Sequence, residues 1–284
     1  MPSSCLICRR KIKKPLFFKK SVAILKCEDC NIAFQERFPE DPLQYYANAS
    51  YYEAWWKDKE KDKAAVRFLK EKTANWVLDQ MGSFSGSGAR ILEVGCAFGF
   101  FLKAARQRNY QITGLEVSEA GKEAGLNGFE VWNVPFENLD LKEGSFDVVV
   151  LIDVIEHFAD PDANLSKIKH LLNKDHGILV LITPDIGSIA CKIFGSKWLH
   201  WKSEHLYYYS RKGISKLLQK HGFKVAVLKN AWKATSLCYM ASHSAKYGNL
   251  PPWLNEVLYR LPFSSVPVMM PSELFCIAQV QKTK

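Results

Sequence analysis

The clearest structural signal in this chain is Ile91-Leu92-Glu93-Val94-Gly95-Cys96-Ala97-Phe98-Gly99, an apolar run that leads into a pair of glycines. The apolar residues suit a buried strand, and the residues from Gly99 to Arg108 have a helical pattern. Glycine permits a tight turn and a close approach of the backbone to a ligand, because no Cβ stands in the way. The helix that follows presents backbone N–H groups suited to a carboxylate or another anion.

Apolar runs typical of buried parallel strands alternate with helical segments from Ala89 onward. The expected strands are Arg90–Val94, Gln111–Glu116, Phe129–Asn133, Phe146–Asp153, Gly177–Thr183, Phe223–Asn230 and Glu273–Gln281. The expected helices are Gly99–Arg108, Glu119–Leu126, Asp162–Leu172 and Arg211–His221. This order predicts an α/β fold, doubly wound around a mostly parallel seven-stranded sheet. Ligands of such sheets bind at the carboxyl ends of the strands.

An acidic residue ends the second expected strand, in Leu115-Glu116-Val117. An acid at this position is placed to accept hydrogen bonds from both hydroxyls of an adenosine ribose. The glycine spacing is G-x-x-x-G and differs from the dinucleotide fingerprint G-x-G-x-x-G. The loop alone is as compatible with a structural turn as with a ligand site, but the loop and Glu116 together indicate a ligand site.

Six segments in this order resemble the class I S-adenosylmethionine-dependent methyltransferases, especially the branch with the ubiquinone-pathway O-methyltransferases. The resemblance covers about residues 89–230 and the last strand, and it implies a Rossmann-like methyltransferase fold. The matching segments are Ile91–Gly99, Gly114–Ser118, Gly144–Val149, Asp153–Pro161, Gly177–Leu179, and Glu204–Leu206 leading to His221–Phe223.

S-adenosylmethionine is the cofactor that the resemblance implies, with its methionine part beside the glycine loop and its ribose beside Glu116. The family's acid that contacts the adenine has no clear counterpart, so Asn133 is the expected substitute and Val134 is expected to flank the ring. Ala97 stands where the family has a middle glycine. The cofactor contacts implied in this way are Glu93, Gly95, Cys96, Gly99, Glu116, Val117, Asn133, Val134, Ile152 and Asp153.

Two histidines are candidate general bases. The sulfonium of the cofactor is already a strong electrophile, so the protein must align the acceptor and remove a proton where the acceptor is an alcohol or a phenol. His157 follows the fourth strand, and His205 lies between the fifth strand and the next helix. In the alternative interpretation each histidine only fixes a loop by hydrogen bonds.

Aromatic segments near these histidines have two interpretations. Lys197–Lys202 and Tyr207–Tyr209 either cover the acceptor pocket or fill the core. Ala234–Pro271 is an insertion that suits an apolar lid, ordinary packing or a dimer contact.

The N-terminal cysteines form two pairs, Cys5-Leu6-Ile7-Cys8 and Cys27-Glu28-Asp29-Cys30. The pattern C-x2-C-x18-C-x2-C has the spacing of a zinc ribbon, and four thiolates close a tetrahedral site around a structural Zn²⁺. The expected organisation is a zinc-ribbon-like module at 1–38, an aromatic and charged helical linker at 39–88, and the methyltransferase domain at 89–284.

Composition and charge indicate where the protein is expected to be located and which partners it is expected to bind. The chain has 284 residues, 48% of them hydrophobic, and a net charge of +10. It contains no apolar run near the ~18 residues of a membrane span and no secretory signal, so a cytoplasmic protein is expected. The basic residues between Arg9 and Lys26 either recruit nucleic acid or form a solvated face, and we favour the second.

These observations favour a methyltransferase that acts on an oxygen or carbon of a small-molecule metabolite, such as a quinone precursor, a lipid or a sugar. One alternative is a ribosomal or transfer RNA methyltransferase that docks through the basic zinc module. Another is a non-catalytic binding protein with the same fold. The sequence leaves the oligomeric state open.

Overall fold

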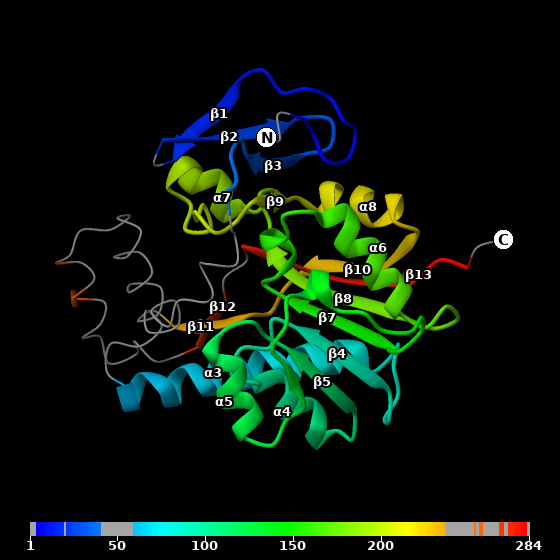
Figure 1. Cartoon of the computed structure of the whole chain (residues 1–284). Helices are drawn as coiled ribbons and strands as arrows, with labels where there is room; N and C mark the ends of the chain where they lie inside the picture. Colours follow the sequence, from blue (N-terminus) through cyan, green and yellow to red (C-terminus); the bar gives the residue numbers. More distant parts are fainter. Residues whose placement is uncertain are drawn as a thin grey trace.

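The computed structural model describes residues 4–19, 21–40, 59–236, 253, 256–257, 267–269 and 272–282. Figure 1 shows a large α/β body with a small β module above it, beside the N-terminus. The body is built on a sheet of seven strands in the order β10-β13-β8-β7-β4-β5-β6. These strands are β4 Arg90–Val94, β5 Gln111–Leu115, β6 Val131–Trp132, β7 Val148–Ile152, β8 Ile178–Pro184, β10 Phe223–Asn230 and β13 Glu273–Val280.

All neighbouring strands of this sheet are parallel except β13, which is antiparallel to both β8 and β10. The predicted mostly parallel, seven-stranded fold is therefore confirmed. Strand β7 stops at Ile152, one residue before its predicted end, because Asp153 has a left-handed backbone with φ 57°. A left-handed residue cannot continue a strand, so the chain turns at that point.

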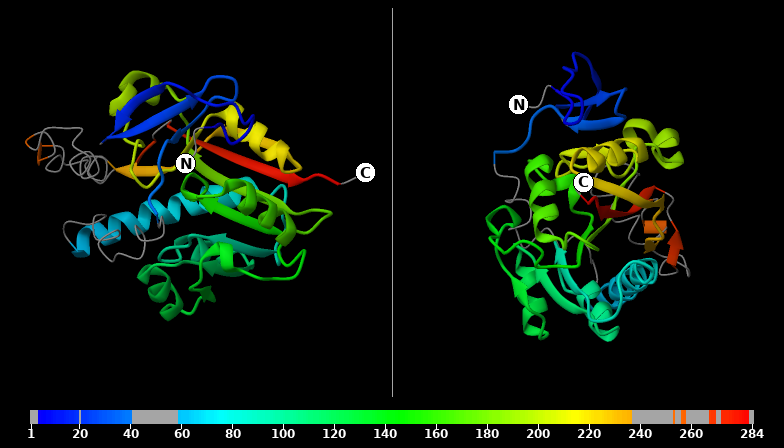
Figure 2. Two further views of the ribbon diagram at one scale, coloured as in Figure 1. Left: turned by 45° about the horizontal axis from the view of Figure 1, so that its top comes forward. Right: turned by 90° about the vertical axis from the view of Figure 1, so that its right-hand side faces the viewer.

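Helices cover both faces of the sheet (Figures 1 and 2). Helices α3 and α4 contribute apolar side chains to a core against one face, and α6 and α8 do so against the other. Successive residues of a strand point to opposite faces, so Ile91 belongs to the first core and Leu92 to the second. The helices are α3 Lys59–Met81, α4 Phe100–Gln107, α5 Glu119–Leu126, α6 Pro161–Leu171, α7 Ile189–Phe194 and α8 Arg211–Lys220, with 3-10 turns η1 Phe136–Asn138, η2 Ile155–His157 and η3 Gly195–Lys197.

The N-terminal module is an antiparallel sheet in the order β1-β2-β3-β9. Its own strands are β1 Pro15–Lys19, β2 Val22–Cys27 and β3 Ile32–Gln35, and β9 Tyr207–Tyr209 comes from the large body. All three tyrosines of β9 are buried, and Trp198 and Trp201 pack with Tyr208 in one cluster. These rings therefore pack together in a buried cluster, which is compatible with both interpretations of the aromatic segments.

The insertion predicted between the last two strands is described only in part. It contains β11 Ala234–Ser236 and β12 Pro267–Met269, which pair antiparallel, and most of its other residues, including Cys238, lie outside the described residues. Within the described ranges, no helix has both the length and the apolar character needed to cross a membrane.

Candidate active site

The glycine loop lies between β4 and α4 and has a left-handed backbone at three positions. Gly95, Ala97 and Gly99 have φ values of 73°, 46° and 76°. A Cβ at Gly95 would lie 2.7 Å from Cγ2 of Val154, which is too close for any other residue to fit without a shift. Gly95 is thus required both by the turn and by the segment that follows β7.

Glu116 lies directly after β5, and its buried carboxylate is fixed by backbone groups. The N–H of Ala97 donates to Oε2 at 3.0 Å, and the N–H of Ser118 donates to Oε1 at 2.9 Å. Asn133, beyond β6, donates from Nδ2 to the carbonyl oxygen of Glu116 at 2.7 Å. Each carboxylate oxygen can accept a further hydrogen bond. The structure therefore brings together Glu116, Asn133 and the glycine loop, the residues predicted to surround the adenosine part of the cofactor.

Glu93 lies in β4 with its side chain buried beneath the same loop. Its Oε2 has no hydrogen-bond partner among the described residues. Burial raises the pKa of Glu93 and the charge of Glu116 raises it further, while the charge of Lys70 offsets part of this rise. A cationic ligand group would supply a hydrogen-bond donor and further neutralising charge. This buried acceptor therefore fits the ammonium of an amino-acid ligand.

The other residues predicted around the cofactor differ in exposure. Cys96 is buried, and a Cβ at Gly114 would lie 2.7 Å from its Sγ, so its side chain packs against β5. Burial raises the pKa of the Cys96 thiol, which suits a packing role. Val117 and Ile152 are half-buried, and Val134 is exposed.

A charged network lies beyond the loop, at the ends of β7 and β13. The ammonium of Lys233 donates to Asp153 Oδ2 at 2.5 Å and to Glu273 Oε1 at 2.9 Å. Burial acts to raise the pKa of Asp153, but the charges of Lys233, Lys70 and Lys202 together hold this pKa below its ordinary value. The second oxygens, Asp153 Oδ1 and Glu273 Oε2, are buried and have no hydrogen-bond partner within the described residues. Sequence reasoning identified Asp153 and missed Lys233 and Glu273.

Next to this network, Glu156, His157 and His205 present polar atoms within 4.8 Å of one another. Thr183, at the end of β8, donates from Oγ1 to Glu156 Oε2 at 2.9 Å. Burial raises the pKa of Glu156 to about 8, and the charge of Asp153 contributes. The structure thus brings both predicted histidines to one place, beside a buried carboxyl group whose pKa is raised.

The hydrogen bond of His157 fixes its tautomer. Its Nδ1 lies 2.8 Å from the carbonyl oxygen of Glu204, and a carbonyl can only accept, so Nδ1 carries the hydrogen. Burial lowers the pKa of His157, so the ring is neutral and Nε2 is its proton-accepting atom. The ring of His205 lies edge-on at a centroid distance of 4.8 Å, and burial lowers its pKa as well.

A third histidine, His200, belongs to the same region; it lies in the segment Lys197–Lys202 but was not named as a candidate base. Its Nε2 lies 3.1 Å from Ser272 Oγ and 3.7 Å from Glu273 Oε1. Burial lowers its pKa to about 3, so the ring stays neutral.

The four N-terminal cysteines place their sulfurs within 4.8 Å of one another, with Cys8 exposed and the other three buried. Each pair forms a tight turn. The N–H of Arg9 donates to the carbonyl of Cys5, and the N–H of Asn31 donates to the carbonyl of Cys27. Arg9 and Asn31 both have left-handed backbones. This set of four sulfurs fits a tetrahedral Zn²⁺.

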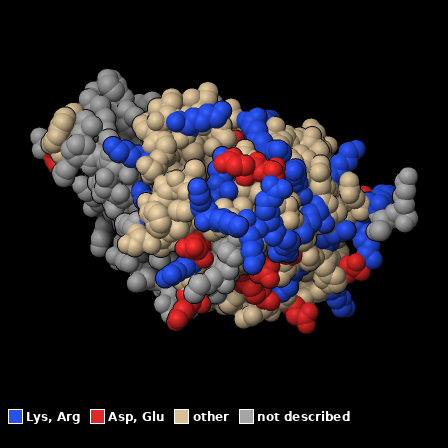
Figure 3. Space-filling model, turned by 90° about the horizontal axis from the view of Figure 1, so that it is seen from above, with Lys and Arg blue, Asp and Glu red and all other residues tan. Residues whose placement is uncertain are grey.

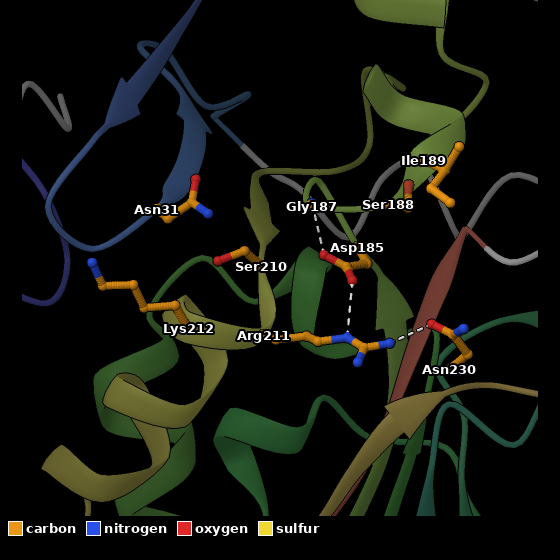
Figure 4. Close-up of a pocket in the computed structure, with 9 residues that line it drawn as sticks. All are labelled: Asn31, Asp185, Gly187, Ser188, Ile189, Ser210, Arg211, Lys212 and Asn230. Carbon is orange, nitrogen blue, oxygen red and sulfur yellow. Dashed lines mark hydrogen bonds and ion pairs between the residues drawn. The ribbon is translucent and has the colours of Figure 1, made fainter. Parts of the chain in front are cut away.

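A pocket of about 410 Å³ lies apart from the predicted cofactor residues, and none of them lines it. Figure 4 shows it between the N-terminal module, the start of α8 and the end of β10. Arg211 crosses it, with Nε 3.5 Å from Asp185 Oδ2 and a hydrogen bond to Asn230. Its lining residues are Asn31, Asp185, Gly187, Ser188, Ile189, Ser210, Arg211, Lys212 and Asn230.

The basic residues of the module lie among acidic ones. Figure 3 shows Lys and Arg side chains gathered on the upper face of the molecule, interspersed with Asp and Glu. Arg9 pairs with Asp162 at 2.6 Å, Arg10 pairs with Asp29, and Lys26 pairs with Glu28. Part of the positive charge that the sequence concentrates here is thus neutralised within the chain.

The methyltransferase domain family model matches residues 40–228, which is more than half of the chain. The ubiquinone biosynthesis O-methyltransferase of Bordetella avium (strain 197N) is 30% identical over 117 residues, covering 38% of this chain and 47% of the relative. This chain thus spans about half the length of the curated relatives that it matches.

Solved structures share the fold at low sequence identity. The 1,6-didemethyltoxoflavin-N1-methyltransferase of Burkholderia thailandensis, solved with 1,6-didemethyltoxoflavin and S-adenosylhomocysteine, is 12% identical. It has a TM-score of 0.54 and covers 95% of this chain and 100% of its own. The [4+2]-cyclase SpnF is 18% identical, with a TM-score of 0.53, and covers 74% of this chain and 81% of its own.

These neighbours establish the fold alone, since one of them is described as a cyclase. The family match includes the segments after the strands that carry the glycine loop, Glu116 and the two histidines. The chain belongs to the methyltransferase domain family and has the fold of the class I S-adenosylmethionine-dependent methyltransferases.

Proposed function

We propose that this protein transfers the methyl group of S-adenosylmethionine to an oxygen or carbon of a small-molecule acceptor. The observation that carries the proposal is the pair of buried carboxylates at the ends of β4 and β5, on either side of the glycine loop. Glu93 offers an acceptor atom for the ammonium of the cofactor, and Glu116 offers two oxygens for its ribose hydroxyls. The remaining residues that we propose to contact the cofactor are Cys96, Val117, Asn133, Val134, Ile152 and Asp153.

When bound, S-adenosylmethionine supplies the electrophilic methyl group. The residues that we assign to the acceptor side are His157 and His205. His157 suits the role of general base because its hydrogen bond to Glu204 directs the proton-accepting Nε2 away from that carbonyl. His205, in ring contact with it, is the second candidate.

A small acceptor is favoured over RNA by two observations. The curated relatives that the chain matches are described as ubiquinone biosynthesis O-methyltransferases. In addition, Arg9, Arg10 and Lys26 are engaged with acidic residues of this chain, so they do not form an uninterrupted track for phosphates.

The four cysteines are proposed to bind one structural Zn²⁺. Because four protein sulfurs would complete its coordination, this metal has no open position for a substrate and takes no direct part in methyl transfer. A quinone precursor, a lipid and a sugar remain the acceptor types that we propose.

Incubation with methyl-labelled S-adenosylmethionine and a cell extract tests this function directly. We expect label in the low-molecular-weight fraction, and label confined to ribosomal or transfer RNA would overturn the choice of acceptor. His157→Gln retains a donor for the Glu204 carbonyl but cannot take up a proton. Its transfer rate should fall by about 10²–10⁴-fold while S-adenosylhomocysteine still binds. Wild-type transfer by this variant would exclude His157 as the base.

A further inference from the structure

Gln35 connects the cysteine module to the segment that carries His205. It is the last residue of β3, and its side chain is only 4% exposed. Its Nε2 lies 2.8 Å from the carbonyl oxygens of Ser203 and His205 and 3.3 Å from that of Lys202. Its backbone N–H donates to the carbonyl of Leu206 at 3.0 Å. One residue thus contacts almost every carbonyl of residues 202–206.

The geometry of these contacts indicates positioning and not simple space filling. An amide nitrogen has two N–H donors, so the two contacts at 2.8 Å take the direct bonds and the longer one shares a donor. Three carbonyls can point at one atom only if the backbone curls around it. This curl around Gln35 fixes the course of the chain up to His205.

The same segment is held on its other side by the turn that carries His157. The N–H of Leu206 donates to the carbonyl of Glu156 at 2.9 Å, and the carbonyl of Glu204 accepts from His157 Nδ1. Residues 202–206 therefore lie between Gln35 and η2. The His157–His205 contact depends on both attachments.

Gln35 is in turn fixed by the cysteine module. Strand β3 pairs with β2 from Cys27↔Ile32 to Ile24↔Gln35, and the turn between these strands carries Cys27 and Cys30. On its other edge β3 pairs with β9, which begins directly after Leu206. A bound metal at the cysteines would thus hold the hairpin on which Gln35 is mounted.

We propose that Gln35 is a positioning residue that sets His205 against His157, and that the cysteine module acts on methyl transfer through this contact. This inference rests on the proposed function for its consequence in catalysis. The role of the module is then internal to the enzyme, because it shapes the acceptor side of the site.

The test compares Gln35→Met, which keeps the length of the side chain and removes both donors, with Gln219→Met, an exposed control on α8. Long-range ¹H–¹⁵N NMR of the histidine rings reports the tautomers and shifts of His157 and His205 without any acceptor. We expect these signals to change in Gln35→Met only. Labelled methyl transfer should fall on the order of 10²-fold, the cost of misplacing a reacting group by about 1 Å. Zinc content and S-adenosylhomocysteine affinity should stay at wild-type values.

A Gln35→Met protein with wild-type ring signals or wild-type transfer would overturn the inference. A parallel loss of zinc, S-adenosylhomocysteine affinity and ring signals would mean that this variant does not fold. Gln35→Asn, which keeps both donors but withdraws them by one methylene, then takes its place. The same readouts and the same overturning result apply to it. Failure of the wild-type protein to bind S-adenosylhomocysteine would instead refute the proposed function and leave the ring comparison valid.

Discussion

The carboxyl ends of the parallel strands form two groups of residues, called here the two halves of the site, and these halves are built in different ways. The half at β4 and β5 consists of residues close in sequence, from Glu93 to Ser118, and its key carboxylate accepts hydrogen bonds from its own loops. The half at β7 and β8 joins Asp153 to Lys233 and Glu273, which are 80 and 120 residues further along the chain. It is assembled from segments that meet only in the folded protein.

The halves also differ in the number of buried polar atoms without a hydrogen-bond partner among the residues described. The second half has four, which are Asp153 Oδ1, Glu156 Oε1, His205 Nδ1 and Glu273 Oε2, and the first half has two, Glu93 Oε2 and Ser118 Oγ. Buried polar groups are nearly always paired, so a concentration of exceptions indicates a place where a ligand or water completes the bonding. Both halves contain such places, and more of them lie in the second half.

Loss of the proposed Zn²⁺ should have the largest effect, because it should impair methyl transfer at the second half while cofactor binding at the first half is kept. In Cys27→Ser/Cys30→Ser, zinc should fall from about one per chain to none, because two of the four ligands are lost. The hairpin that supports Gln35 should then loosen, so methyl transfer and thermal stability should drop sharply. S-adenosylhomocysteine affinity, measured by calorimetry, should change by less than about threefold, because β4 and β5 lie outside the module.

Cys191→Ser is the matched control, since Cys191 is buried but not among the four clustered cysteines. This variant should retain its zinc and its methyl-transfer activity. Full zinc in the double variant would place the metal elsewhere, and an equal loss of cofactor affinity would contradict the independence of the two halves.

Lys233→Met should have the next largest effect, because it removes the ammonium group that donates to both Asp153 and Glu273. The free energy of unfolding at pH 7 should fall by about 3 kcal/mol, as for other broken buried pairs. Asp153, whose pKa Lys233 helps to hold low, stabilises the wild type above pH ~3.8, and this contribution is lost as pH falls further. Loss of Lys233 should raise the pKa values of both carboxyl groups relative to the wild type, so the variant should lose stability relative to the wild type as pH rises above ~4.5.

Urea unfolding at pH 4 and pH 7 measures this difference, with Lys224→Met as an exposed control on the neighbouring strand β10. The difference in the free energy of unfolding between wild type and Lys233→Met should be larger at pH 7 than at pH 4. A difference that is equal at both pH values, or larger at pH 4, would show that the stability of the network does not depend on the charge of Lys233.

The same contrast explains what could be predicted from the sequence. The strand and helix pattern and the glycine loop are local, so the seven-stranded sheet and the Gly95–Glu116 region could be predicted from neighbouring residues. The buried positions of Lys233, Glu273 and Gln35 could not, because polar residues of these types are usually exposed and their partners are distant in sequence. The only sequence signal for Gln35 and Glu273 is that each stands at the end of an apolar strand.

The roles of individual residues are a separate matter from their placement. The structure brings His157 and His205 together, and it puts Asn133 beside Glu116. Those roles stay predictions.

The central claim is that the β4–β5 half binds S-adenosylmethionine, and calorimetric titration with S-adenosylhomocysteine and with NAD tests it most directly. We predict saturable binding of S-adenosylhomocysteine at one site and no binding of NAD. In Glu116→Ala the binding free energy should weaken by about 1–3 kcal/mol, because hydroxyl groups of the ligand lose their partner in a buried site. Binding of NAD without S-adenosylhomocysteine, or an unchanged affinity in Glu116→Ala, would contradict the account.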